Sequence, residues 1–550
     1  MTAVAVLALG LAALRTARAA LLYISLWQVR EYRWDRFRAY LSTPAARALA
    51  LHPLALSRLA LLAALVASAR WVPGAVALVA VVALYALEGL LAVREAAQRT
   101  IRRPARTARA LALVDVVTLA GWAAIGAAGA VTLRSDLEPG PRWLSLALAL
   151  LAVDRLLPFV AGAAVLLARL PNQALLRIDV RRARRALRGS RALVVGITGS
   201  YGKTSTKTFL ATILSARYRV WFTPGSVNTL VGVARLVGHA LARGQGYDAM
   251  IIEMGAYREG EIRAMCDLVR PRIGVLTVVA EQHLALFGSV ERTLEAKFEL
   301  IEALPADGLA VLNADDDRMA RRSQRVGVRK RFFSATRPAD VWAKDVGLDR
   351  DALTFTVVYG QEEARFRCQL LGRHNVEPLL AATAVALELG MTLPEIAEVA
   401  AAIAPVPRTM QPLRLATGAL LIDDTFSASR QAVLAALDYL EEMPAARRLV
   451  VISGVPELAG MTRPAHEEIG RRMGQVCDRM VAVHGDFTGY YAAALGDAAR
   501  DGRFVFEPNP ARAADLLGDL GPEDVVLFEG RGAERVLERV RARAEAASPA

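Results

Sequence analysis

Five long apolar stretches lie before residue 172, and they restrict the fold of this chain more than any other feature of its sequence. They cover roughly residues 3–27, 53–69, 72–92, 110–133 and 143–168. Most of them approach or exceed the ~20 residues that a helix needs to cross a bilayer, although the second is short and Arg15 and Arg18 interrupt the first. We therefore expect residues 1–170 to form an α-helical polytopic membrane domain with about five transmembrane helices.

The connectors between these stretches alternate in charge. Three of them are rich in arginine, namely 28–52, 93–109 and 171–191. The other two, near 71–74 and 134–142, are short and carry little charge. This alternation follows the positive-inside rule. It predicts a multi-pass protein of the cytoplasmic (inner) cell membrane, with its N-terminus outside and everything after residue 171 in the cytoplasm, where ATP is.

The basic charge belongs to the N-terminal part alone. Residues 1–192 hold 26 Arg, no Lys and 9 acidic residues, whereas the remainder is close to neutral. A basic, apolar segment joined to a near-neutral body indicates contact with membrane lipid and not with nucleic acid. Two alternatives remain for the apolar stretches: a soluble bundle of buried helices, and a cleaved signal peptide at 17–19, although the first stretch lacks a basic n-region.

Ionisable residues interrupt the apolar stretches. Glu88, Asp115 and Asp154 lie at or near apolar depth, where charged groups are costly and often functional. The alternative is that they lie near span ends or pair with Arg58 or Arg155. The sequence leaves both interpretations open.

Lysine is almost absent from this chain. There are 63 Arg but only five Lys: Lys203, Lys207, Lys297, Lys330 and Lys344. A lysine that survives such a bias is a candidate for a task that arginine cannot perform.

After the basic connector the pattern changes to short β-rich runs alternating with helical stretches, which predicts an α/β domain with a largely parallel sheet. Its first strand, 192–196, runs into Gly196-Ile-Thr-Gly-Ser-Tyr-Gly-Lys-Thr204, and a helix follows from 205 to about 215. This is a P-loop in its strand–loop–helix setting. The strict pattern requires glycine at 197, where this chain has isoleucine.

The residue types of this loop suit nucleotide triphosphate chemistry. Gly199 and Gly202 let backbone N–H groups close around phosphate oxygens, and Ser205 follows at the start of the helix. Lys203 reaches the β- and γ-phosphates, and the Thr204 hydroxyl ligates Mg²⁺. We expect ATP and magnesium as cofactors.

The segment Gly199-Ser-Tyr-Gly-Lys-Thr-Ser-Thr206 resembles the ATP loop of the Mur ligase family, and further segments match that family in the same order. These segments are 225–233, 251–262, 283–289, 296–299, 312–316, 372–375 and 422–426. The resemblance covers about 193–550. It implies a P-loop Mur-ligase central domain over 171–405 and a Rossmann-like C-terminal α/β domain over 406–550.

The resemblance also implies two Mg²⁺ sites. Glu253, at the end of a buried strand, would supply a hard oxygen ligand, and the family position of His283 ligates the second ion. Lys297 matches the lysine that several Mur ligases carbamylate, so that a cation becomes an anion that helps to hold the metals. Arginine cannot be carbamylated, and the survival of Lys297 in this lysine-poor chain favours that role. The alternatives are a structural histidine and a carboxylate paired to an arginine.

Asn313, His374 and Asn375 resemble the family's adenine and ribose site, and Asp423 resembles its ATP-contacting acidic residue in the last domain. Helix capping by Asn375 or a turn at Asn313 would explain those two residues without a ligand.

The chain departs from the family branch that adds D-alanyl-D-alanine in three places. Asn-Ala-Asn-Pro becomes Ser427-Ala-Ser-Arg430, and a late Lys-Gly-Ser becomes Glu529-Gly-Arg531. The domain that grips the UDP-sugar peptide is replaced by the membrane helices. The ATP and magnesium residues are therefore retained, whereas both substrate-recognition regions differ.

The resemblance implies a membrane-bound ATP-dependent carboxylate–amine ligase that acts through an acyl phosphate. A cell-wall peptide precursor, linked to the membrane, is the leading substrate. The alternatives are a poly-γ-glutamate-type polymer synthetase and a non-catalytic ATP-binding membrane scaffold; a transport ATPase is disfavoured because no second nucleotide-site motif is present.

Overall fold

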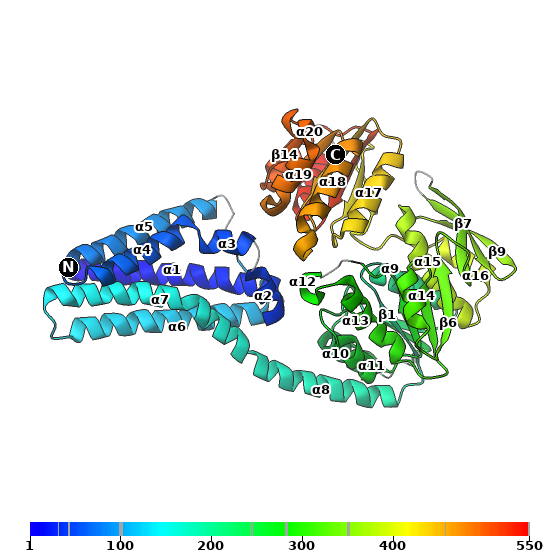
Figure 1. Ribbon diagram of the computed structural model, residues 1–550, viewed down its shortest axis with the longest axis horizontal. Coiled ribbons are helices and arrows are strands. Elements are labelled where there is room, and N and C mark those ends of the chain that lie inside the picture. Colours follow the sequence, from blue (N-terminus) through cyan, green and yellow to red (C-terminus); the bar gives the residue numbers. More distant parts are fainter. Residues whose placement is uncertain are drawn as a thin grey trace. The chain divides into compact units, whose positions relative to one another are not determined.

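The computed structural model describes residues 1–30, 32–41, 44–97, 103–242, 244, 246–280, 284–348, 352–456 and 458–547. The chain forms two compact units, Met1–Leu175 and Leu176–Ala550. The first unit is helical, whereas the second contains two β-sheets covered by helices (Figure 1).

The helices of the first unit follow the predicted apolar stretches. They are α1 (Thr2–Val29), α2 (Trp34–Leu41), α3 (Pro44–Ala50), α4 (Pro53–Ala67), α5 (Gly74–Ala97), α6 (Ala108–Arg134) and α7 (Pro139–Leu167), followed by α8 (Arg169–Arg188), which enters the second unit. Four of them, α1, α5, α6 and α7, are long and apolar enough to cross a membrane, and α4 is a shorter apolar helix of 15 residues. Only 28–33% of the residues in the apolar windows of the four are buried.

Connectors of similar charge meet at the ends of the helices. The side chain of Gln28 bonds to the backbone N–H and C=O of Ala105, at 2.6 and 3.1 Å, so two arginine-rich connectors meet at one end of the bundle. At the other end a Cβ on Gly74 would lie 1.8 Å from the carbonyl oxygen of Gly140, which brings the two charge-poor connectors together. Helix α1 contributes buried residues such as Ala8 to the core shared with α5 and α7.

A buried network of charges joins four of these helices. Arg15 of α1 contacts Glu88 of α5 at 2.7 Å and also pairs with Asp154 of α7. Arg58 of α4 pairs with the same two carboxylates, and Arg155 contacts Asp154 at 2.9 Å. The side chains of Glu88 and Asp154 are only 5% and 4% exposed. Both carboxylates are therefore neutralised by arginines, as one of the two sequence interpretations predicted, whereas Asp115 is exposed on α6.

The second unit begins with a sheet of nine strands in the order β2-β3-β1-β4-β5-β6-β7-β8-β9. Neighbours are parallel from β2 to β7, and β8 and β9 add an antiparallel hairpin at one edge. The strands are β1 (Leu193–Thr198), β2 (Val220–Phe222), β3 (Ala249–Glu253), β4 (Ile273–Leu276), β5 (Leu309–Asn313), β6 (Arg329–Ser334), β7 (Val341–Leu348), β8 (Leu353–Tyr359) and β9 (Glu362–Cys368).

Helices cover both faces of this sheet. One face packs against α9 (Lys203–Ser215), α15 (Val376–Glu388) and α16 (Leu393–Ala400). The other packs against α10 (Leu230–Ala242), α11 (Glu261–Val269) and α13 (Val290–Glu302), while α12 (Leu284–Phe287) and α14 (Asp317–Ser323) are short connections. The strands β1, β3 and β5 are buried on both faces, as expected for a parallel sheet between helices.

The second sheet has six strands in the order β10-β11-β15-β12-β13-β14, all parallel except β10. They are β10 (Gln411–Arg414), β11 (Leu420–Asp424), β12 (Arg447–Ile452), β13 (Arg479–Ala482), β14 (Phe504–Phe506) and β15 (Asp524–Glu529). Its helices are α17 (Arg430–Glu442), α18 (Thr462–Val476), α19 (Thr488–Leu495), α20 (Asp497–Arg500), α21 (Pro510–Asp515) and α22 (Glu534–Ala547). Two α/β folds with mainly parallel sheets follow the helical unit, as the sequence predicted.

The charge network gives a first prediction. Asp154→Asn leaves three guanidinium groups facing one carboxylate in an apolar interior, and we expect it to destabilise the first unit by roughly 3–5 kcal/mol. The measurement is thermal denaturation of the purified chain in detergent, followed by circular dichroism. Asp115→Asn is the matched control, because this exposed aspartate should change stability by no more than about 0.5 kcal/mol. Equal melting temperatures for the two variants would contradict a stabilising network.

Candidate active site

The loop between β1 and α9 has glycine where a phosphate-binding loop needs it. A Cβ on Gly199 would meet the Thr277 hydroxyl oxygen at 1.8 Å, and Gly202 has a φ of +79°, which side chains with a Cβ rarely adopt. Position 197 of the strict pattern is an isoleucine because its side chain is fully buried in the core beside the sheet. The shift of the glycine to 199 therefore keeps the loop at the N-terminus of α9, where backbone N–H groups can bind phosphate.

Lys203 begins α9 and its side chain folds back over the loop. Its Nζ donates to the carbonyl oxygens of Gly199 and Ser200, both at 2.8 Å. Burial lowers the pKa of Lys203 below its ordinary value, while the nearby carboxylate of Glu253 acts in the opposite direction. Backbone carbonyl oxygens are therefore the partners of the ammonium group. The anionic oxygens of a bound phosphate chain could take their place.

Glu253, the last residue of β3, joins the loop helix to the sheet. One carboxylate oxygen accepts from the Thr204 hydroxyl at 3.0 Å and from Lys207 Nζ at 2.9 Å, and the other accepts from Asn228 at 3.0 Å. The Lys207 ammonium also donates to the Gly225 carbonyl. A carboxylate beside a threonine hydroxyl is the oxygen donor set that Mg²⁺ prefers, so these residues fit the expected metal.

Lys297 of α13 reaches the same loop from the other side. Its Nζ donates to the carbonyl oxygen of Gly199 at 2.9 Å, so this one oxygen receives hydrogen bonds from both Lys203 and Lys297. Lys297 is 2% exposed. Burial, and secondly the charge of Lys203, hold its pKa well below the ordinary value. Its amine is therefore shifted toward the neutral, nucleophilic form.

Ser205 and His283 are two other expected site residues. Ser205 is buried in the first turn of α9, directly after Thr204. His283 lies outside the described residues.

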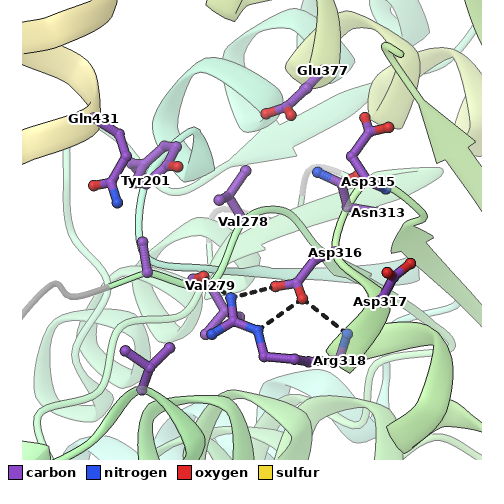
Figure 2. Close-up of a pocket in the computed structure, with 12 residues that line it drawn as sticks. Tyr201, Val278, Val279, Asn313, Asp315, Asp316, Asp317, Arg318, Glu377 and Gln431 are labelled. Atoms are coloured by element: carbon purple, nitrogen blue, oxygen red, sulfur yellow. Dashed lines mark hydrogen bonds and ion pairs between the residues drawn. The ribbon is translucent and has the colours of Figure 1, made fainter. Parts of the chain in front are cut away.

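A pocket of about 360 Å³ opens beside the loop. Its lining includes Tyr201 of the loop, Asn313 at the end of β5 and Glu377 in the first turn of α15. Figure 2 shows Glu377 across the pocket from Arg318, whose guanidinium is held by Asp316 through hydrogen bonds of 2.8 Å. The size and position suit a nucleoside next to the phosphate loop.

The expected nucleotide ligands differ in whether they line this pocket. Asn313 lines the pocket, but the described lining does not include His374, Asn375 or Asp423. Asn375 donates to the Leu371 carbonyl at 2.7 Å, and burial lowers the pKa of His374 to about 4. Asp423 accepts hydrogen bonds from the backbone N–H and the hydroxyl of Thr425, at 3.1 and 2.6 Å.

Glu529, which stands where the resemblance leads one to expect lysine, is fully buried and pairs in register with Asp424 across β15 and β11. Burial raises the pKa of Asp424 to about 7 and that of Glu529 well above its ordinary value. The raised pKa values favour the protonated, neutral form of these carboxyl groups, and this position carries no cation.

Sequence reasoning missed two residues of the site. Lys207 had no assigned task, yet it is buried and holds Glu253; its position one helical turn after Lys203 was the available signal. Glu377 was not singled out, although it follows Asn375 by two residues and lines the pocket. Burial, and secondly Asp315, raise the pKa of Glu377 to about 7.

Comparisons with known proteins identify two family domains in this chain. The model of the Mur ligase middle domain matches residues 197–386, and the model of the Mur ligase glutamate ligase domain matches residues 410–532. Both matches lie in the second unit.

Two curated relatives are both UDP-N-acetylmuramoyl-tripeptide–D-alanyl-D-alanine ligases. The protein of Mycobacterium tuberculosis is 34% identical over 62% of this chain and 70% of its own length. The protein of Escherichia coli is 34% identical over 51% of this chain and 61% of its own length. A solved structure, the MurF ligase of Thermotoga maritima in complex with ADP, is 26% identical, has a TM-score of 0.61 and covers 68% of this chain and 85% of its own.

The Glu253 cluster gives a second prediction. Lys207→Met leaves a buried carboxylate without its cation, and we expect a loss of stability of roughly 3–5 kcal/mol. Lys344→Met is the control, because Lys344 pairs with Glu363 on the surface and such pairs contribute about 0–1 kcal/mol. Thermal denaturation of both variants tests this, and a Lys207→Met protein as stable as the control would contradict it.

Glu377 gives a third prediction, on pH. The folded state binds the proton of this carboxyl more tightly than the unfolded chain does, so stability from this group falls as pH rises from about 4.5 to about 7. Glu377→Gln should remove this loss. We expect the variant to be about 2–3 kcal/mol more stable than the parent near pH 8 and nearly equal near pH 5. Glu398 lies on the exposed side of α16. Glu398→Gln is the control and should be as stable as the parent at both pH values.

Proposed function

This chain belongs to the Mur ligase family of ATP-dependent, amide-bond-forming ligases, and from that premise we propose that it joins a carboxylate to an amine at the cytoplasmic face of a membrane. The observation that carries the proposal is the meeting of Lys203, Lys297 and Glu253 around one loop. These three residues come from α9, α13 and β3.

The proposed reaction has two steps. The γ-phosphate of ATP is transferred to an oxygen of the carboxylate, giving an acyl phosphate and ADP; the amine then attacks the acyl carbon, and phosphate leaves as the amide forms. The chain's part is to position the reactants and to neutralise charge. Gly199, Gly202, Thr204 and Ser205 would bind phosphate oxygens through the loop, and Lys203 would neutralise the phosphoryl group in transfer.

The residues beside the loop would hold two magnesium ions. Thr204, Glu253, His283 and Lys297 are the proposed ligands, the last as a carbamate. Magnesium would supply charge neutralisation to the phosphoryl group. The neutral amine of Lys297 is the form that adds to CO₂, and its burial beside Lys203 supports this modification. Asn313, with His374, Asn375 and Asp423 on domain closure, would contact the nucleoside and ribose.

We propose that the first unit is the membrane anchor. A soluble bundle would bury its apolar residues, whereas most residues in the apolar windows of α1, α5, α6 and α7 are not buried. The arginine-rich connectors at one end of the bundle favour that end as the cytoplasmic one. The N-terminus would then lie outside and the Mur ligase domains in the cytoplasm.

The proposed substrate is a cell-wall peptide precursor with a free carboxylate, carried on a membrane lipid. The curated relatives act on a UDP-N-acetylmuramoyl tripeptide, which supports the peptide class. The lipid carrier is supported by the membrane helices, which stand where the resemblance leads one to expect the domain for the soluble sugar nucleotide.

The deciding experiment measures ADP release by the full chain in nanodiscs. Peptide carboxylates in soluble and lipid-linked form are offered with and without D-alanyl-D-alanine or a single amino acid. We expect release that needs both substrates and that Lys203→Ala abolishes. A product that lengthens with time would favour a polymer synthetase, and ATP binding without turnover for any pair would favour a scaffold.

A fourth prediction concerns Lys297. Lys297→Arg places a permanent cation that cannot be carbamylated, so we expect ADP release to fall by about 10²-fold or more while ATP binding is retained. Lys344→Arg should behave as the parent chain. Calorimetric ATP binding and mass measurement of the intact parent chain, with and without bicarbonate, accompany the assay. Full activity of Lys297→Arg would contradict the carbamate.

A further inference from the structure

Helix α8 (Arg169–Arg188) follows α7 after a single residue, and it is the most basic element that the structure describes. Six of its arginines are exposed: Arg177, Arg181, Arg182, Arg184, Arg185 and Arg188. Among the described residues none of the six takes part in an ion pair or a side-chain hydrogen bond. Six positive charges are thus gathered on one helix without an anionic partner.

Five of these six arginines share one side of the helix. Positions 177, 181, 184, 185 and 188 recur at the spacing of one helical face. Apolar residues lie on the opposite side of the helix. Ala183 is fully buried, and Val180 and Leu187 pack beside it in the core. The helix is therefore amphipathic, with an apolar inner face and an arginine outer face.

The inner face is fixed to the ATP-binding domain. Ala183 lies against Gly238 of α10, where a Cβ would come within 3.6 Å of the α8 backbone. Asp179, the acidic residue within the arginine-rich part, is 3.3 Å from Arg235 of α10. Since the inner face is occupied, the arginine face has no place to pack within the second unit.

Two exposed apolar residues continue the arginine face toward α7. Leu175 is 52% exposed and Ile178 is 42% exposed. On the helical projection they lie at the edge of the arginine face, beside Arg182. Large apolar side chains beside arginines are typical of a helix that rests in the interface of a bilayer.

We propose that the outer face of α8 is a docking surface for the anionic headgroups of phospholipids in the leaflet at which α7 ends. This rests on the proposed membrane location and adds a partner to it. Guanidinium groups bind phosphate oxygens in bidentate fashion, and their aliphatic stems can lie along acyl chains. Leu175 and Ile178 would enter the interface, and the inner face would hold the ATP-binding domain at the membrane.

Charge alone would also suit RNA. The chain continuity from α7 and the two exposed apolar side chains favour lipid, because a nucleic acid backbone has no need of leucine and isoleucine beside the arginines.

The experiment uses a fluorophore on α8 of the full chain. Ile178→Cys provides the attachment site, since Cys266, Cys368 and Cys477 are buried. The labelled chain is placed in nanodiscs that contain a small fraction of headgroup-nitroxide lipid, in phosphatidylcholine alone or with about 30% phosphatidylglycerol. Quenching of the fluorophore reports its contact with headgroups.

The proposal predicts about twofold stronger quenching with phosphatidylglycerol, and a loss of that difference between about 0.1 and 0.5 M salt. Arg181→Gln with Arg184→Gln and Arg188→Gln should remove the phosphatidylglycerol effect. The matched control neutralises three exposed arginines of α22, Arg535, Arg539 and Arg541, and should keep it.

Equal quenching in the two lipid compositions, or an effect that survives in the α8 variant, would overturn the proposal. So would a fluorescence change caused by added RNA in detergent but not by phosphatidylglycerol. ADP release is measured in the same nanodiscs. Normal ADP release together with quenching that does not depend on the lipid would reject the α8 surface alone. A chain that does not enter nanodiscs would reject the membrane location as well.

Discussion

The carboxylate of Glu253 is the contact on which the nucleotide-binding fold depends. It ends a fully buried strand and accepts hydrogen bonds from two residues of α9 and from Asn228, so the loop helix, the central strand and the following segment are tied at one point. Because the carboxylate is almost inaccessible to water, its charge has to be balanced by the buried ammonium of Lys207. These contacts within the protein hold the loop helix and the strand together, and such prior positioning would favour phosphate transfer.

The carbonyl oxygen of Gly199 complements this arrangement. Two lysines of different helices donate to it. Burial, and secondly the charge of Lys203, lower the pKa of Lys297 and favour loss of its proton. One backbone oxygen thus organises both a cation suited to phosphate and an amine suited to chemical modification. Both lysines contact the same loop. In this loop the first glycine of the strict pattern is replaced by the buried Ile197, and a glycine stands two positions later, at 199.

Much of the fold and of the site could be predicted from the sequence. The motifs and their order predicted the phosphate-binding loop, the parallel sheets, and the positions of Glu253 and Lys297 near the loop. The misses have a common cause. Lys207 and Glu377 owe their importance to burial and to partners distant in the chain, and a single sequence specifies neither. His283 lies outside the described residues, so its role stays a prediction.

The charged residues of the helical unit also have partners that are distant in the sequence. Sequence identified Glu88 and Asp154 as unusual residues in apolar helices, but only the fold reveals that each is held by two or more guanidinium groups from other helices. Such a network limits how the protein can evolve. A change at one member leaves its partners unneutralised, so substitutions at positions 15, 58, 88 and 154 should be inherited together, and the helices that carry them should diverge as a single unit.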